Sequence, residues 1–287
     1  MAVVTVDAPS TGNAITQPML VALAATFNGL ASDETVRCAV LTGTGRRAFS
    51  TGIDLGDAEK VFKMDENDRD KDVVHQMERC AFPIVGAVNG VAINAGFEMA
   101  LACDILLASQ NAAFVDTHAK LGIVPSWGLS QKLPRIVGAN LARWASLACT
   151  PIDAETALRC GLVSEVVAET ATAAGGGKDT SGGVRSSREE TDEGIDASVT
   201  HREGTCVASR DNPRLTAAAL AVARKIANLP RSGVSGYKRV MRDGLALPYG
   251  EAREMERRVA FAQYRALPES FFKRMKAAAG LTPRARL

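Results

Sequence analysis

Two short apolar runs of this chain each break at a glycine, and a carboxylate follows the second break. The runs are residues 48–55 (AFSTGIDL) and 88–98 (VNGVAINAGFE), with the breaks at Gly52 and Gly96. Glycine allows the backbone to turn sharply and lets a ligand approach closely. Two such breaks can present two backbone N–H groups to one oxygen atom, which stabilises an oxyanion. Glu98 follows the second break by two residues and could transfer protons at the same site, so the pattern indicates an enzyme.

The composition lies in the ordinary range of a soluble globular protein. The 287 residues are 46% hydrophobic and 23% charged, with a net charge of +2 and 5% aromatic residues. Near-neutral charge gives no reason to expect nucleic acid or an anionic membrane as a principal partner. Few aromatic residues also argue against a stacking surface for single-stranded nucleic acid. The six cysteines are scattered without a C-x-x-C pair, which favours small buried side chains in a reducing compartment.

Targeting signals are confined to the C-terminus. No apolar run reaches the roughly 18 residues of a membrane span, and no N-terminal signal peptide is visible. The chain ends in Ala-Arg-Leu287, which resembles the small–basic–leucine address of peroxisomal proteins. We therefore expect a peroxisome or a similar organelle, and otherwise the cytoplasm, with no membrane segment.

The elements that must position these residues alternate between strands and helices. Unalternating apolar runs predict covered strands, and apolar residues at helical spacing predict the helices between them. The strands are expected near residues 3–6, 36–41, 84–88, 104–108 and 162–167, and helices near 18–30 and 96–103. A further helix is predicted with Thr150 as N-cap, Pro151 at its first position and Gly161 at its end. This alternation predicts an α/β fold with a covered sheet.

The composition changes after the last of these strands. Residues 168–211 are rich in Gly, Ser, Thr and charged residues, and they lack the apolar density that offsets the entropy of ordering. We predict a disordered low-complexity insert there. Helices are expected from Pro213 onward, over 215–229, 236–245, 251–267 and 269–279. The predicted organisation is thus a core of residues 1–167, an insert of 168–211 and a helical region of 212–287.

Several segments together resemble the crotonase family, which comprises the enoyl-CoA hydratases and isomerases. The two glycine breaks carry the resemblance together with residues 114–125 (FVDTHAKLGIVP), 133–138 (LPRIVG) and 154–163 (AETALRCGLV). The resemblance implies a spiral of strand–strand–helix repeats with a helical C-terminal region that joins subunits into a homotrimer or hexamer. It also implies an acyl-CoA thioester substrate and an enolate stabilised on the thioester oxygen.

By position in these motifs, the two oxyanion donors would be the backbone N–H groups of Ile53 and Ala95. The neighbouring Thr51, Gly52, Asp54 and Gly96 would complete the substrate-binding segments. Arg46, Arg47, Lys60 and Lys63 flank the first break and could meet the phosphates of coenzyme A, or could equally be solvated surface residues. The chemistry requires no metal and no bound redox cofactor, since coenzyme A is part of the substrate.

Family hydratases commonly use two glutamates, and this chain departs from that pattern. Glu98 matches the first, whereas the second position holds His118, with Asp116 two residues before it. Histidine can act as a general acid or base near neutral pH, so His118 could replace the missing carboxylate. Asp116 would share a face with His118 in an extended segment, and could orient the imidazole or serve itself. Trp127 could reshape the acyl pocket or belong to the core.

The function predicted from the sequence is an enoyl-CoA hydratase-like lyase of fatty-acid or branched-acid breakdown. It would add water to 2-enoyl-CoA thioesters, with Glu98 assisted by His118 or Asp116. Two alternatives stay open. One is an enoyl-CoA isomerase or another acyl-CoA lyase or hydrolase of the same fold. The other is a non-catalytic protein on this scaffold, including an RNA-binding one.

Overall fold

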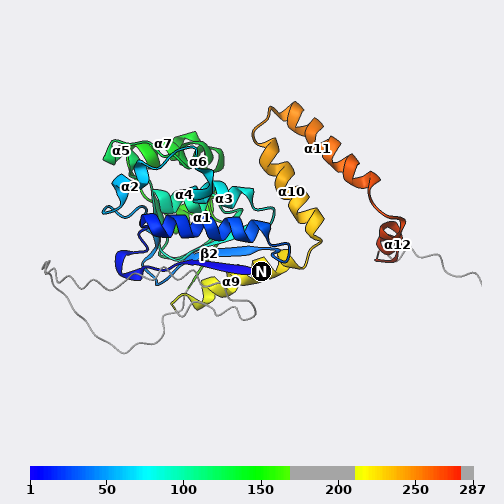
Figure 1. Ribbon diagram of the computed structural model, residues 1–287, viewed down its shortest axis with the longest axis horizontal. Coiled ribbons are helices and arrows are strands. Elements are labelled where there is room, and N and C mark those ends of the chain that lie inside the picture. Colours follow the sequence, from blue (N-terminus) through cyan, green and yellow to red (C-terminus); the bar gives the residue numbers. More distant parts are fainter. Residues whose placement is uncertain (169–210, 279–287) are drawn as a thin grey trace, which may run out of the picture. The chain divides into compact units, whose positions relative to one another are not determined.

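The chain folds into two compact units. The computed structural model describes residues 1–168 and 211–278. The first unit spans Met1–Arg231 and the second Ser232–Leu287. The first unit contains two sheets and the helices that cover them (Figure 1). It holds every residue that the sequence predicts for the site.

The larger sheet has five strands, all parallel. Its order is β1 (Ala2–Val6), β2 (Ala39–Gly43), β4 (Ile84–Val88), β6 (Ile105–Ser109) and β9 (Glu165–Val167). Every residue of β2 and β4 is buried, as expected for strands covered on both faces. The unalternating apolar runs therefore predicted both central strands. The bounds of β4 agree with the prediction, whereas β2 begins and ends later than the expected 36–41.

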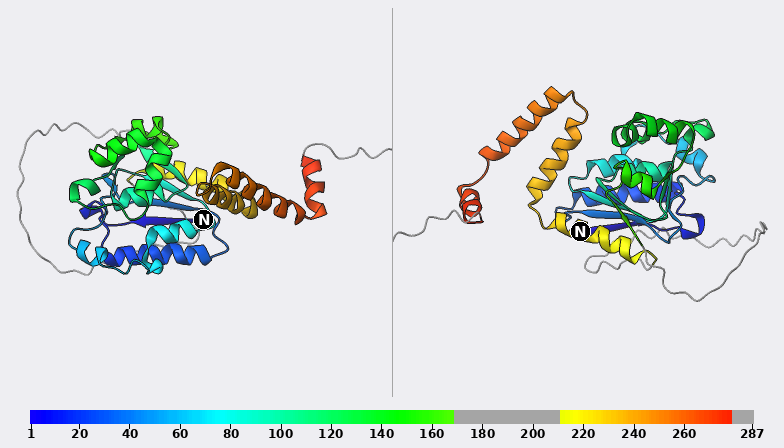
Figure 2. Two further views of the ribbon diagram at one scale, coloured as in Figure 1. Left: turned by 90° about the horizontal axis from the view of Figure 1, so that it is seen from above. Right: turned by 180° about the vertical axis from the view of Figure 1, so that it is seen from behind.

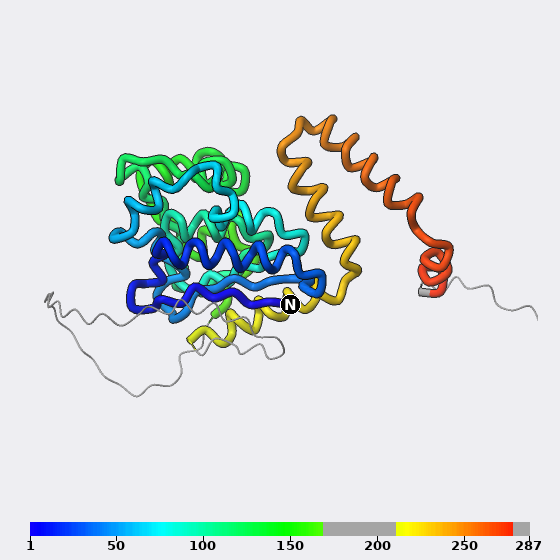
Figure 3. Tube along the Cα trace, viewed as in Figure 1, coloured from blue at the N-terminus to red at the C-terminus, as the bar shows by residue number. Residues whose placement is uncertain are grey.

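Helices cover both faces of this sheet. On one face, α1 (Gln17–Ser32) packs against α3 (Val73–Arg79) and buries Leu20, Leu23 and Phe27. Figure 3 traces α1 alongside β1 and β2. On the other face, α9 (Pro213–Ala227) packs Leu215, Ala219 and Leu220 against the sheet. The strand side chains in this cluster are Val40, Val85 and Leu107. Figure 2 shows α9, in yellow, on the side of the sheet away from α1.

The smaller sheet gives the fold its repeat. It contains β3 (Ala48–Ser50), β5 (Val91–Ile93), β7 (Ala113–Val115) and β8 (Ile152–Asp153), of which only the last pair is antiparallel. The chain passes from β4 to β5 and then into α4 (Ala95–Leu101), and likewise from β6 to β7 and then into α5 (His118–Leu121). This succession is the strand–strand–helix repeat that the sequence predicts.

One helix begins later than predicted. The structure places the N-cap of α8 (Ala154–Arg159) at Asp153, whose carboxylate accepts a hydrogen bond of 2.8 Å from the Thr156 N–H. The expected N-cap, Thr150, lies outside the helix because Ile152 pairs with Phe114 between β8 and β7. Gly161 follows the helix with a φ of 77°, so its expected role at the end is confirmed.

The first unit includes α9, which the sequence prediction grouped with the C-terminal helices. The predicted insert of 168–211 lies, except for its two end residues, outside the described residues. Its two ends are close together, because the Arg214 guanidinium donates a hydrogen bond of 3.4 Å to the carbonyl of Ala168. The end of β9 and the start of α9 therefore lie next to each other.

The second unit is helical, as predicted. Its helices are α10 (Arg231–Gly244), which begins at the last residue of the first unit, α11 (Tyr249–Arg265) and α12 (Glu269–Ala278). No residue of α10 or α11 is buried, and large apolar side chains are exposed on them, including Tyr237, Met241, Phe261 and Tyr264. Among the described residues, no helix is long and apolar enough to cross a bilayer.

Candidate active site

The two glycine breaks lie against each other at the ends of β3 and β5. Gly52 has a φ of 95°, and a Cβ atom there would lie 3.0 Å from the Ile93 carbonyl oxygen and 3.7 Å from the Ala95 nitrogen. A Cβ atom on Gly96 would lie 2.4 Å from the carbonyl oxygen of Ser50. A side chain at either position would therefore push the two segments apart, and glycine permits their close approach.

The backbone N–H groups of Ile53 and Ala95 emerge from these adjoining segments. Ile15 donates to the Gly52 carbonyl at 2.8 Å and accepts from the Asp54 N–H at 2.9 Å. Since Ile15 bonds to both neighbours of Ile53 in this parallel bridge, the N–H of Ile53 is directed away from it. Ala95 is the first residue of α4, where no preceding turn supplies an acceptor. Within residues 1–168 and 211–278, neither amide donates a hydrogen bond.

Two flanking side chains that the sequence assigns to substrate binding are engaged within their own loops. The Thr51 hydroxyl donates to the Thr11 carbonyl at 3.3 Å, and the Asp54 carboxylate accepts from the Gly56 N–H at 2.8 Å. These contacts shape the turn that carries Ile53. Contact of either residue with substrate stays a prediction.

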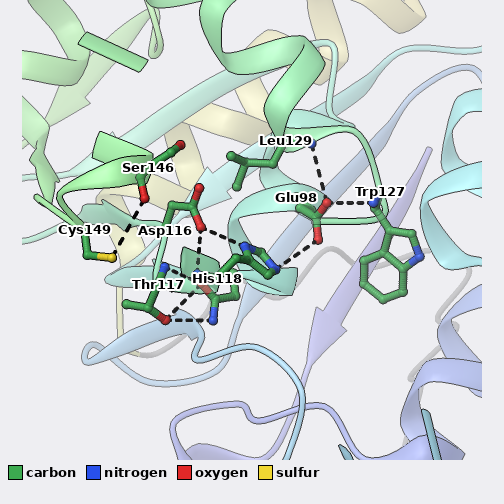
Figure 4. A network of polar contacts seen from close by, with 9 residues as sticks. Glu98, Asp116, Thr117, His118, Trp127, Leu129, Ser146 and Cys149 are labelled. Carbon is green, nitrogen blue, oxygen red and sulfur yellow. Dashed lines mark hydrogen bonds and ion pairs between the residues drawn. The ribbon is translucent and has the colours of Figure 1, made fainter. Parts of the chain in front are cut away.

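Glu98 is held on α4 at the inner side of the site. Its carboxylate Oε1 accepts hydrogen bonds from the backbone N–H groups of Trp127 at 2.7 Å and Leu129 at 3.5 Å (Figure 4). The intervening Gly128 has a φ of 96°, which allows the chain to turn between the two donors. Only 2% of Glu98 is exposed. Burial raises the pKa of the Glu98 carboxyl above its ordinary value, and the hydrogen bonds and the nearby His118 oppose this only in part.

His118 lies between two carboxylates. Its Nε2 is 3.9 Å from Oε2 of Glu98, and its Nδ1 is 2.7 Å from Oδ1 of Asp116. Burial acts to raise the pKa of Asp116, but hydrogen bonds from the His118 ring, the Ser146 hydroxyl and the His118 N–H outweigh it and lower that pKa. An ionised carboxylate can only accept hydrogen bonds. The Nδ1 atom therefore carries the hydrogen, and Nε2 faces Glu98.

The contact between Asp116 and His118 does not arise from an extended segment. His118 is the first residue of α5, and the Asp116 carboxylate accepts from the His118 backbone N–H at 3.1 Å as well as from its ring. A turn thus folds the two side chains together. Asp116 therefore contacts the His118 ring as needed to orient it. The extended backbone that the sequence suggested for this contact is not present.

Sequence reasoning missed the residues that hold this array. Asn94, the residue before α4, has the unusual dihedral angles φ 47° and ψ −111°, and its side chain binds Thr117. Ser146 lies on α7 (Ala139–Leu147), and its hydroxyl helps to lower the pKa of Asp116. Asn94 could have been found, since Asn tolerates positive φ better than most residues. No local pattern links Ser146, 30 positions along the chain, to Asp116.

The remaining candidates lie outside this array. Trp127 is half-buried and packs against the main core, while its indole lies beside Glu98 in Figure 4. Arg46 and Arg47 are exposed, and Lys60 and Lys63 form ion pairs with Asp57 and Glu59 on the surface of α2 (Ala58–Phe62). The part of the chain that the structure describes contains no group of three His, Cys, Asp or Glu residues that could hold a metal ion.

Comparison with known proteins decides the family. The family model described as enoyl-CoA hydratase/isomerase matches residues 1–174. The chain belongs to the enoyl-CoA hydratase/isomerase family. An Arabidopsis thaliana relative named "Probable enoyl-CoA hydratase 1, peroxisomal" is 40% identical over 276 residues, which cover 96% of this chain and 88% of the relative. The short-chain-enoyl-CoA hydratase of Clostridium acetobutylicum is 34% identical over 170 residues, or 58% of this chain and 65% of that protein.

Solved structures agree on the fold of this family member. The crystal structure of an enoyl-CoA hydratase from Bacillus anthracis superimposes with a TM-score of 0.72 at 22% identity, covering 99% of this chain and 95% of that one. The predicted resemblance and the predicted fold class are thus confirmed.

Proposed function

We propose that this family member hydrates 2-enoyl-CoA thioesters to 3-hydroxyacyl-CoA. The observation that carries the proposal is a pair of unengaged amides on segments adjoining the helix that bears Glu98, with His118 beside that carboxylate. The two relatives described above carry hydratase names. The proposal assigns polarisation of the thioester to the main chain and proton transfer to the side chains.

The thioester carbonyl oxygen would accept hydrogen bonds from the N–H groups of Ile53 and Ala95. When water adds to Cβ, negative charge moves onto this oxygen and forms an enolate. Donors placed in advance stabilise that charge without reorganisation, and removal of one such donor costs about 3–4 kcal/mol. Since the donors belong to the main chain, Gly52 and Gly96 control them through the approach of the two segments.

Glu98 would accept a proton from the attacking water, whose oxygen bonds to Cβ. His118, protonated at Nε2, would then give its proton to Cα and return to the neutral imidazole. The proton on Glu98 can pass to His118 across the 3.9 Å between Oε2 and Nε2, directly or through a second water, which resets both groups. Asp116 holds the ring and stabilises its charged form. The net reaction consumes one water and leaves the enzyme unchanged.

Turnover of crotonyl-CoA tests this proposal. The conjugated thioester absorbs in the ultraviolet, so hydration is followed by loss of absorbance and by appearance of 3-hydroxybutyryl-CoA. Chelator-treated protein is expected to keep its activity, since the reaction needs no metal or redox cofactor. A parallel assay on a 3-enoyl-CoA reports isomerisation. Turnover of that substrate alone, or salt-dependent RNA binding without turnover, would overturn the hydratase assignment.

We further infer a homotrimer or hexamer assembled through the C-terminal helices. The large apolar side chains exposed on α10 and α11 support this, since exposed apolar surface of this kind marks an interaction site. Light scattering on the purified full chain should give three or six times the chain mass of 30.3 kDa. A monomeric mass would overturn the inference.

We also propose that the Ala-Arg-Leu ending directs the protein to peroxisomes. These residues lie outside the described part of the chain, and the support comes from the sequence and from the peroxisomal name of the Arabidopsis relative. A fluorescent protein fused to the N-terminus should accumulate in peroxisomes, and removal of the last three residues should release it to the cytosol. Equal distribution of the two fusions would contradict the proposal.

A further inference from the structure

Asn94 adopts a backbone conformation that glycine adopts more readily. Its φ of 47° and ψ of −111° correspond to the first central position of a type II′ turn, where glycine is normal because a Cβ atom is disfavoured. The chain nevertheless carries a side chain there. The contacts of that side chain explain why an asparagine is useful.

The Asn94 side chain ties α4 to the segment that precedes His118. Its Oδ1 accepts the backbone N–H of Thr117 at 2.7 Å and the Thr117 hydroxyl at 3.1 Å, and its Nδ2 lies 2.8 Å from the same hydroxyl oxygen. Figure 4 shows Thr117 next to His118. Since Thr117 is the residue before His118, the asparagine holds the start of α5.

The Asn94 main chain fixes the adjoining oxyanion donor. Its N–H donates to the Val115 carbonyl at 3.0 Å, and its C=O accepts the Glu98 N–H at 2.8 Å. The peptide that joins Asn94 to Ala95 is planar, so the orientation of this C=O also determines the orientation of the Ala95 N–H. One residue therefore touches the elements that carry the amide, Glu98 and His118.

We propose that Asn94 is a positioning residue that holds the Ala95 N–H and His118 in one fixed arrangement, and this inference rests on the proposed function of the site. A glycine at position 94 satisfies the backbone but loses the bond to Thr117. The amide donor and the proton donor then lose their common support. Binding of the uncharged thioester is little affected, whereas stabilisation of the enolate and proton transfer are weakened.

The test compares the wild-type full-length protein with Asn94→Gly and Thr117→Val. For Asn94→Gly we expect kcat for crotonyl-CoA to fall about tenfold with KM within about twofold, the size expected for loss of well-placed hydrogen bonds. Thr117→Val loses only the hydroxyl contacts, so its kcat should fall by about threefold. The double variant should be no slower than Asn94→Gly, because both changes break the same link. Asn67→Gly, at an exposed turn where Asn67 binds Asp65, is the matched control with unchanged kcat.

Ligand binding separates this inference from the hydratase assignment. Acetoacetyl-CoA forms an enolate, whereas butyryl-CoA is an uncharged saturated thioester. Asn94→Gly should weaken acetoacetyl-CoA binding about tenfold and butyryl-CoA binding less than about twofold, whether or not the wild type turns over crotonyl-CoA. Equal weakening of both ligands, or wild-type affinity and kcat in Asn94→Gly, would overturn the proposal. If Asn94→Gly does not fold, the same ligand comparison on Thr117→Val decides.

Discussion

Replacement of Glu98 by glutamine removes the proposed base while preserving its packing. The glutamine Oε1 can still accept the N–H groups of Trp127 and Leu129 at 2.7 and 3.5 Å. The amide differs from the carboxylate by its charge and its lack of basicity. The two backbone donors, Ile53 and Ala95, are unchanged, so the substrate should still bind and its thioester should still be polarised.

The expected loss is large and confined to turnover. A positioned general acid or base contributes about 10²–10⁴ in rate, which corresponds to about 3–5 kcal/mol at about 1.4 kcal/mol for each factor of ten. We expect kcat for crotonyl-CoA to fall within that range in Glu98→Gln. The KM, and the affinity for butyryl-CoA, should stay within about threefold, because the lost group acts on water and not on the acyl-CoA.

The assay follows the loss of crotonyl-CoA absorbance at several substrate concentrations. Glu155→Gln is the matched control, since Glu155 is an exposed α8 residue whose ion-pair partner, Arg159, is also exposed, and its kcat should equal that of the wild type. Thermal unfolding of each variant establishes that the fold is retained. A Glu98→Gln protein with kcat within about twofold of the wild type would refute the assigned role, because loss of a true base exceeds that by at least about tenfold.

Four further predictions concern this carboxylate and its surroundings. Burial raises the pKa of Glu98 above the ordinary glutamate value of 4.5. The rise of kcat/KM with pH should therefore have its midpoint above 4.5. A midpoint at or below 4.5 would contradict this. Because the pKa of Glu98 is higher in the folded state than in the unfolded state, its contribution to stability is present below the unfolded pKa and is lost as pH rises through the folded pKa. Urea unfolding between these two pKa values should therefore show the wild type losing stability relative to Glu98→Gln. A difference in unfolding free energy that stays constant with pH would contradict this. In Asp116→Asn the imidazolium of His118 loses an ionised partner 2.7 Å away. Steady-state kinetics should show kcat lowered about 10–100-fold, which corresponds to the free energy of a hydrogen bond to a charged group. An unchanged kcat would remove Asp116 from the mechanism. Gly96→Ala would place a Cβ atom 2.4 Å from the Ser50 carbonyl oxygen, and chemical denaturation should show a loss of about 1–3 kcal/mol; an equally stable variant would show that α4 can move away from β3.

The sequence predicted most of the secondary structure because the spacing of its apolar residues indicates which positions are buried. Ile84–Val88 was predicted with its observed bounds, since both faces of the strand are covered and every residue is apolar. The start of α8 was wrong for a tertiary reason. Thr150 and Pro151 are good local signals for a helix start, but pairing of Ile152 with Phe114 extends the chain there and moves the N-cap to Asp153.

The site was predictable only where its residues follow a strand or a glycine break. Gly52 and Gly96 reveal the close approach of two segments, and Glu98 follows directly from one of them. The donors that hold Glu98 are backbone N–H groups of Trp127 and Leu129. Nearly every residue type has a backbone N–H, so the sequence gives almost no sign of such a donor. Asn94 was missed because a sharp turn predicts glycine first, although positive φ also occurs at asparagine.

The hydrogen bond from Arg214 to the Ala168 carbonyl has a consequence for engineering of the protein. It brings together two residues 46 positions apart in sequence, one directly after β9 and the other in the first turn of α9. Closing a long loop costs free energy that grows only with the logarithm of its length. The stretch between these ends can therefore lengthen, shorten or accept a foreign domain with little thermodynamic penalty, which makes it a natural point for grafting a reporter into the enzyme.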